Sequence, residues 1–89
     1  MNVGELRALL DRLPDDAVVL TSGYEAGYAP ASGFAAEVQQ LDRGFADWLG
    51  PYELVTDARR LVTQDRAPEG VPLLVGDPVQ ALLIYRRGR

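Results

Sequence analysis

The last apolar segment of the chain, VQALLIYRR, restricts the fold more than any other part of the sequence. Ala81, Leu83 and Tyr85 alternate with Leu82 and Ile84, so a strand here is apolar on both of its faces. Such a strand is stable when both faces are covered and a neighbour pairs on each side, as in the centre of a sheet. The segment therefore predicts a central strand in a layered fold.

An amphipathic helix is expected at the N-terminus, from about residue 3 to residue 13. Its apolar positions recur at helical spacing and form one stripe. They are Val3, Leu6, Leu9, Leu10 and Leu13. Asn2 can cap this helix, because Glu5 follows three residues later in the pattern of a capping box. Pro14 disfavours helical geometry at Leu13, so we expect the helix to end there.

The segment that follows, AVVLT, is β-branched and apolar on both faces, and it predicts a strand over residues 17–21. Residues 34–49 are ambiguous. Phe34, Ala36 and Val38 alternate with less apolar neighbours as in a half-buried strand. An apolar stripe at helical spacing also runs through Phe34, Val38, Leu41, Phe45, Trp48 and Leu49. Periodicity alone slightly favours the helix, although Gly44 inside it would cost about 1 kcal/mol.

Glycine and proline punctuate residues 50–78, which predicts turns and only short elements. We expect a helical turn near residues 54–62, a short extended piece at PLLV and a turn at Gly76-Asp77-Pro78. The end of the chain carries Arg86, Arg87 and Arg89, which we interpret as a solvated basic tail.

These elements predict an α+β fold of two layers. The N-terminal helix would pack on a small, mostly antiparallel sheet of three or four strands. With 89 residues, the chain has the length of one small domain, spanning residues 1–89.

The amino-acid composition lacks most of the residue types that enzymes use for catalysis. The sequence has no cysteine and no histidine, and all nine basic residues are arginines. A thiol nucleophile, a histidine base and a lysine Schiff base are therefore excluded, and the usual ligands of transition metals are missing. We expect a protein that is not an enzyme, with no catalytic residues, no metal site and no cofactor.

The net charge and the N-terminal sequence limit the kinds of partner that the protein can bind. A formal net charge of -4 disfavours direct binding to a nucleic-acid backbone. The sequence has no signal-peptide pattern and no apolar run long enough to cross a membrane. We expect a cytoplasmic protein without membrane contact, and the sequence leaves homodimerisation open.

The segment TSGYEAGY concentrates two tyrosines and a glutamate between glycines that favour a turn. In one interpretation, Tyr24 and Tyr28 fold back and cover the end of a small core. In the other, they bind a partner protein together with Trp48 and Tyr52, because tyrosine and tryptophan contribute much interface energy at little entropic cost. Glu25 would then contact an arginine or an amide of that partner.

Three segments resemble a group of small uncharacterised proteins from bacteriophages, prophages and plasmids. That group opens with TVxELIxxLxxLPxDAxV, continues into a Gly-Tyr-Glu-Gly-Gly-like loop and carries a WYYGPHE-like segment. The matching residues are Val3, Glu5, Leu6, Leu10, Leu13, Pro14, Asp16, Ala17 and Val19 in the opening, Gly23, Tyr24, Glu25 and Gly27 in the loop, and Trp48, Gly50, Pro51 and Glu53 in the third segment. The resemblance covers the first 53 residues and, weakly, the final strand. The sequence departs from the group at Ala26, usually glycine, and at Tyr52, usually histidine.

This resemblance implies a mobile-element setting and a strand at GFAAEVQQL, and it implies no activity. By analogy with other small acidic proteins of such elements, we expect an interaction module that occupies a surface of a host defence complex, as anti-CRISPR proteins do. The alternative is a small-molecule or peptide-binding module that uses the Gly-Tyr loop.

Overall fold

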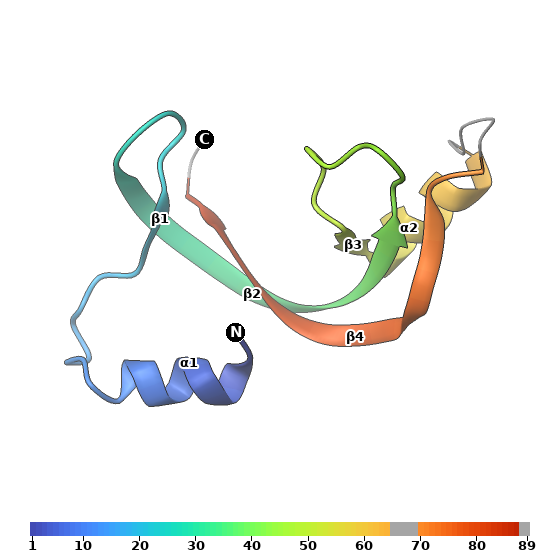
Figure 1. Ribbon diagram of the computed structural model, residues 1–89. Helices are drawn as coiled ribbons and strands as arrows, with labels where there is room; N and C mark the ends of the chain where they lie inside the picture. The colour runs from blue at the N-terminus through green and yellow to red at the C-terminus, as the bar shows by residue number, and fades with distance from the viewer. Residues whose placement is uncertain (65–69, 88–89) are drawn as a thin grey trace. The chain divides into compact units, whose positions relative to one another are not determined.

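The computed structural model of the protein describes residues 1–64 and 70–87. Over these residues it shows an α+β fold with two helices and a four-stranded antiparallel sheet, which confirms the fold class predicted from the sequence (Figure 1). The elements follow in the order α1 (Val3–Leu10), β1 (Leu20–Ser22), β2 (Tyr28–Asp42), β3 (Tyr52–Leu54), α2 (Val55–Gln64) and β4 (Leu73–Arg86).

The chain divides into two compact units, and the long strands β2 and β4 contribute to both. The terminal unit contains Met1–Phe34 and Leu82–Arg89, and therefore α1, β1 and one end of the β2–β4 pair. The central unit contains Ala35–Ala81, with the other end of that pair, β3 and α2.

In the terminal unit, α1 begins with the predicted capping box. The Asn2 side chain accepts a hydrogen bond from the Glu5 backbone at 2.8 Å, and the Glu5 carboxylate accepts one from the Asn2 backbone at 3.4 Å. The helix ends at Leu10, earlier than expected. Leu13 then donates to the Leu10 carbonyl at 2.9 Å, a tighter turn that leads into Pro14.

The predicted strand over residues 17–21 forms later, as β1, and pairs antiparallel with the start of β2. The register places Leu20 opposite Pro30 and Ser22 opposite Tyr28. Residues 34–42, for which periodicity slightly favoured a helix and the resemblance implied a strand, continue β2 as a strand. Pairing explains the outcome, because β2 bonds to other strands along its length, whereas an isolated helix would contribute only local bonds.

The expected turn at Gly76-Asp77-Pro78 is wrong, since β4 runs through these residues without ending. Gly76 has a φ of 66°, a left-handed conformation that glycine adopts without steric cost. The Gln39 side-chain amide of β2 donates to the carbonyls of Val75 and Gly76, both at 2.9 Å. A side chain of β2 therefore bonds to the irregular part of β4.

The prediction of a central strand at the end of the chain is also wrong. In the described residues, β4 pairs with β2 alone and is an edge strand. The pattern VQALLIYRR reports correctly that both faces of this strand are apolar, but it cannot report whether the same chain supplies a second neighbour.

The core is small and lies in the central unit. Its buried apolar residues are Val38 and Leu41 of β2 and Ala58 of α2, and Gln39 is buried with them. Val38 pairs with Leu54 of β3, and the next residue along the chain begins α2, so this helix follows the hairpin directly and contacts β3. In the terminal unit, no described residue is buried.

We predict that Gln39→Met lowers the free energy of unfolding by about 1 kcal/mol, because the two hydrogen bonds that join this buried side chain to β4 are lost while the carbonyls of Val75 and Gly76 remain accessible to water. Gln40→Met is the matched control. The Gln40 side chain is exposed, so that variant should stay within about 0.5 kcal/mol of the original protein. Urea denaturation measures both, and equal midpoints for the two variants would contradict the role assigned to Gln39.

Candidate interaction surfaces

The tyrosine loop, residues 23–28, is a compact turn in the terminal unit. The Gly23 backbone N–H donates to the Gly27 carbonyl at 2.9 Å, and Gly27 has a φ of 71°. A Cβ at Gly23 would lie 2.5 Å from the Ala26 carbonyl oxygen, so a larger residue would force this turn to shift. Tyr24 is 84% exposed and Tyr28 is 80% exposed. Neither ring is buried as a lid over a core.

One arginine from the basic end of the chain, Arg86, packs against this loop. The Arg86 guanidinium lies 5.4 Å from the centroid of the Tyr24 ring, within the range of a cation–π interaction. Arg87 donates to the Ser32 hydroxyl at 3.1 Å. The expected solvated tail is therefore wrong for Arg86, which is partly buried. Arg87 is exposed as expected, and Arg89 lies outside the described residues. Arg86 lies over one face of the Tyr24 ring, and the ring as a whole stays largely exposed.

The aromatic loop, residues 43–51, connects β2 to β3 in the central unit and is ordered by its own backbone. Asp42 accepts a bond from the Gly44 N–H at 2.9 Å. Within the loop, Ala46 donates to Arg43 at 3.2 Å and Leu49 donates to Ala46 at 3.2 Å, while at its end Leu41 donates to Pro51 at 2.6 Å. Such turns position the side chains between them without burying them.

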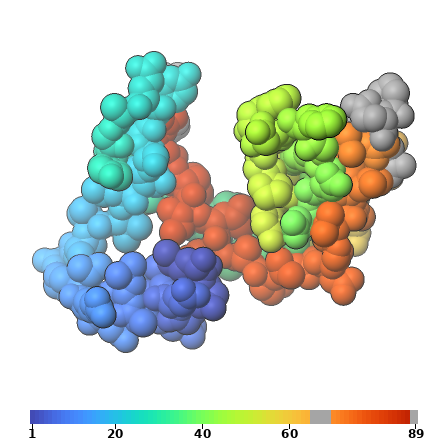
Figure 2. All heavy atoms as spheres, in the orientation of Figure 1, coloured from blue at the N-terminus to red at the C-terminus, as the bar shows by residue number. Residues whose placement is uncertain are grey.

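Two large aromatic side chains project from this loop. Phe45 is 98% exposed and Trp48 is 78% exposed, and Figure 2 shows the loop at the surface of its unit. Tyr52 begins β3 directly after the loop and is about half exposed. Exposing phenylalanine and tryptophan forfeits their hydrophobic stabilisation, so their position in an ordered loop is typical of residues that become buried on binding.

An ion pair closes the base of the aromatic loop. An Arg43 guanidinium nitrogen lies 2.5 Å from a Glu53 carboxylate oxygen. The Arg43 side chain is only 12% exposed, whereas Glu53 is 36% exposed. Another nitrogen of this side chain, Nε, is buried without a hydrogen-bond partner. Glu53 therefore carries most of the compensation for a largely buried charge.

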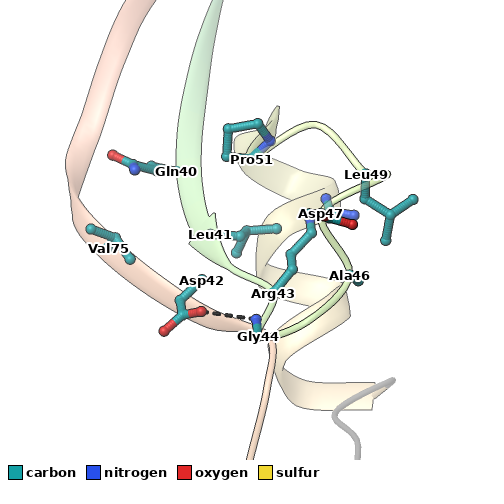
Figure 3. A pocket seen from close by; sticks show the side chains of 10 residues that line it. All are labelled: Gln40, Leu41, Asp42, Arg43, Gly44, Ala46, Asp47, Leu49, Pro51 and Val75. Atoms are coloured by element: carbon teal, nitrogen blue, oxygen red, sulfur yellow. Dashed lines mark hydrogen bonds between the residues drawn. The ribbon is translucent and has the colours of Figure 1, made fainter.

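A hollow of about 510 Å³ lies beside the aromatic loop (Figure 3). Gln40 and Val75 line it from β2 and β4, and Ala46, Asp47 and Leu49 line it from the loop. Leu41 and Pro51 add further apolar surface. The hollow combines apolar walls with carboxylate groups and is open to solvent, so it can receive a side chain of a partner that packs on the loop.

The residues predicted from the sequence as partner contacts fall into two groups. Tyr24, Glu25 and Tyr28 belong to the terminal unit, and Trp48 and Tyr52 belong to the central unit. Each group is exposed or about half exposed. Phe45 was missed, because the sequence placed it in an apolar helical stripe. Its position directly after Gly44, a residue that breaks helices, was the available signal for a loop.

The described residues contain no cluster of three or more histidine, cysteine, aspartate or glutamate side chains that could hold a metal ion. No described helix is long and apolar enough to cross a membrane. No known protein family matches the chain, and no curated protein or solved structure is significantly similar to it. The function is therefore inferred from the two loops and from the sequence.

We predict that Glu53→Gln lowers the free energy of unfolding by about 1 kcal/mol, because a largely buried arginine loses its charged partner while Glu53 itself is partly solvated. The aromatic loop should also become more mobile. Trp48, the one tryptophan of the sequence, reports this motion directly through its fluorescence anisotropy. Glu37→Gln, at an exposed position of β2, is the control. Unchanged Trp48 anisotropy in the Glu53 variant would show that the ion pair does not order the loop.

Proposed function

We propose that this protein is a non-enzymatic interaction module that binds another protein through the tyrosine loop and the aromatic loop. The exposure of Phe45 and Trp48 on a loop ordered by backbone hydrogen bonds carries the proposal. Aromatic anchors that are already positioned lose little conformational entropy on binding, so more of their interaction energy appears as affinity.

The tyrosine loop supports the same function. Its two exposed rings lie on either side of Glu25, which is also exposed. Tyrosines offer a partner both apolar area and a hydroxyl group, and a carboxylate between them can pair with an arginine or an amide. This combination suits a partner surface that is partly apolar and carries basic or amide groups.

The residue inventory supports binding over catalysis. The sequence contains no histidine, cysteine or lysine, and its formal net charge is -4. A partner that is itself a nucleic acid is disfavoured by this charge, whereas a basic protein surface that normally holds nucleic acid would attract it.

The resemblance to phage, prophage and plasmid proteins supports a role in such an element. In that setting the module would inhibit a host defence complex by occupying one of its surfaces, as anti-CRISPR proteins do. The alternative, a small-molecule or peptide module closed by the tyrosine loop, has weaker support, because the residues that line the 510 Å³ hollow come from the central unit and not from that loop.

We predict that the protein, when expressed in bacteria, blocks CRISPR interference and that Phe45→Ser/Trp48→Ser abolishes the block. In bacteria that have an active CRISPR system and express the protein, a targeted plasmid should transform as frequently as an untargeted one. The inhibited defence complex, captured from these cells with the original protein, should bind the double variant more weakly by about 2 kcal/mol or more, because both aromatic anchors are gone. Its thermal midpoint should change little, because both side chains are exposed.

Val18→Ser is the control, because Val18 is also apolar and mostly exposed but lies outside both loops. It should retain inhibition and binding. Tyr24→Ser/Tyr28→Ser tests the second loop separately and should weaken binding without lowering stability. Full inhibition by both aromatic double variants would exclude the two loops as the binding surface. If no CRISPR system in a broad panel is inhibited, the inhibitor role fails, and titration of a captured partner with the same variants still tests the interaction role.

A further inference from the structure

Strand β4 has the sequence of an interior strand and the position of an edge strand. Near its end, before Arg86, the residues Leu82–Tyr85 carry no charge and are apolar in succession, yet β4 pairs only with β2 among the described strands (Figure 1). Natural proteins usually protect an exposed edge with charges, prolines or a covering segment. Between Leu82 and Tyr85 this edge has no charge and no proline.

The free edge offers backbone groups for pairing. Arg87 donates its backbone N–H to Pro30 of β2 at 2.8 Å, so this residue faces the paired edge. Backbone polar groups in an antiparallel pair alternate between the two edges from one residue to the next. Those of Leu82, Ile84 and Arg86 therefore face away from β2, where another strand can bond to them.

The apolar side chains around this edge are also exposed to solvent. Leu82 and Ile84 lie on one face of the sheet and Tyr85 lies on the other, and each is about half exposed. Phe34 of β2 contacts Tyr85 edge-to-face with ring centroids 5.9 Å apart, and it too is nearly half exposed. The described part of the terminal unit contains no buried residue, although a unit of about 40 residues generally needs a core, metal, disulfide or oligomer to fold.

The exposed apolar surface area of the terminal unit is as large as the area that one subunit buries in a dimer interface. Outside the tyrosine loop and the segment before β1, the large apolar side chains of the terminal unit that stand about half exposed or more belong to α1, its flanking residues and the β2–β4 pair. Together they leave on the order of 800 Å² of apolar surface, similar to the roughly 800 Å² that each partner buries in a standard stable interface.

We propose that two copies of this protein form a two-fold symmetric dimer by antiparallel pairing of β4 with β4 at this edge. A second copy is the occupant that fits, because it is present whenever the chain is made and the unit needs cover in order to fold. The pairing continues the sheet across the dimer and gives Leu82–Tyr85 the second neighbour that their sequence requires.

The arginines at the end of β4 favour antiparallel pairing of the two β4 strands over parallel pairing. Arg86 and Arg87 follow the apolar residues directly. Parallel pairing would place these arginines beside their counterparts, and like charges directly opposite one another destabilise a sheet. Antiparallel pairing separates the two arginine pairs to opposite ends of the paired segment, and the residues between them are apolar.

The absence of cysteine from the sequence allows a direct test, because a single introduced cysteine can form a disulfide only with a second copy. Ile84→Cys should cross-link under mild oxidation at least tenfold faster than Val18→Cys, an equally apolar control outside β4. Paired strands bring Cα atoms to about 4.5–5.5 Å, within the range that a disulfide spans. Sedimentation equilibrium of the original protein should give twice the chain mass of 9.7 kDa.

Ile84→Lys should raise the dimer dissociation constant at least tenfold and lower the thermal midpoint, because a charge is placed at the paired edge. The thermal midpoint of the original protein should rise with protein concentration, as it does when folding and association are coupled. A cooperatively folded monomer whose midpoint does not depend on concentration would overturn the proposal. So would a dimer in which Val18→Cys cross-links as fast as Ile84→Cys, since a different surface would then form the interface.

Discussion

Every other strand of the sheet bonds to β2, so the fold depends on keeping this one strand extended and in register. β1 pairs with its beginning, β3 pairs with its end, and β4 pairs with it as well. The buried residues Val38 and Leu41 also belong to it. Gln39 adds a polar constraint, because its amide bonds to β4 where Gly76 interrupts regular strand geometry. Loss of that amide would remove the two side-chain hydrogen bonds that join the buried part of β2 to β4.

The described residues separate the parts of the protein that stabilise it from those that are available for recognition. Val38, Leu41 and Ala58 form the core, and none of them belongs to the tyrosine loop or the aromatic loop. The two loops carry exposed aromatic side chains and are ordered by glycine turns, backbone hydrogen bonds and the contact of Arg86 with Tyr24. Substitutions in the loops can therefore change binding with little effect on stability.

The free edge of β4 has a different role from the loops. Its exposed residues are leucine, isoleucine and tyrosine in a strand, and they suit continuous sheet pairing and packing. The loop aromatics suit contacts with pockets of a partner. A dimer built on β4 would present each of the two loops twice, which raises the effective affinity for a partner that has repeated sites.

The sequence by itself determined the local features, because they depend on residues close together in the chain. It specified the capping box of α1, the turn at the tyrosine loop, the strand character of Leu82–Tyr85 and the α+β class. Only the tertiary structure decided that residues 34–42 are a strand, that β4 continues through Gly76-Asp77-Pro78 and that it lies at an edge. These outcomes depend on hydrogen bonds between segments far apart in sequence, such as Gln39 with Val75, and periodicity within one segment carries no information about such partners. The exposure of Phe45 follows the same rule, since an apolar residue is buried only when another part of the chain reaches it.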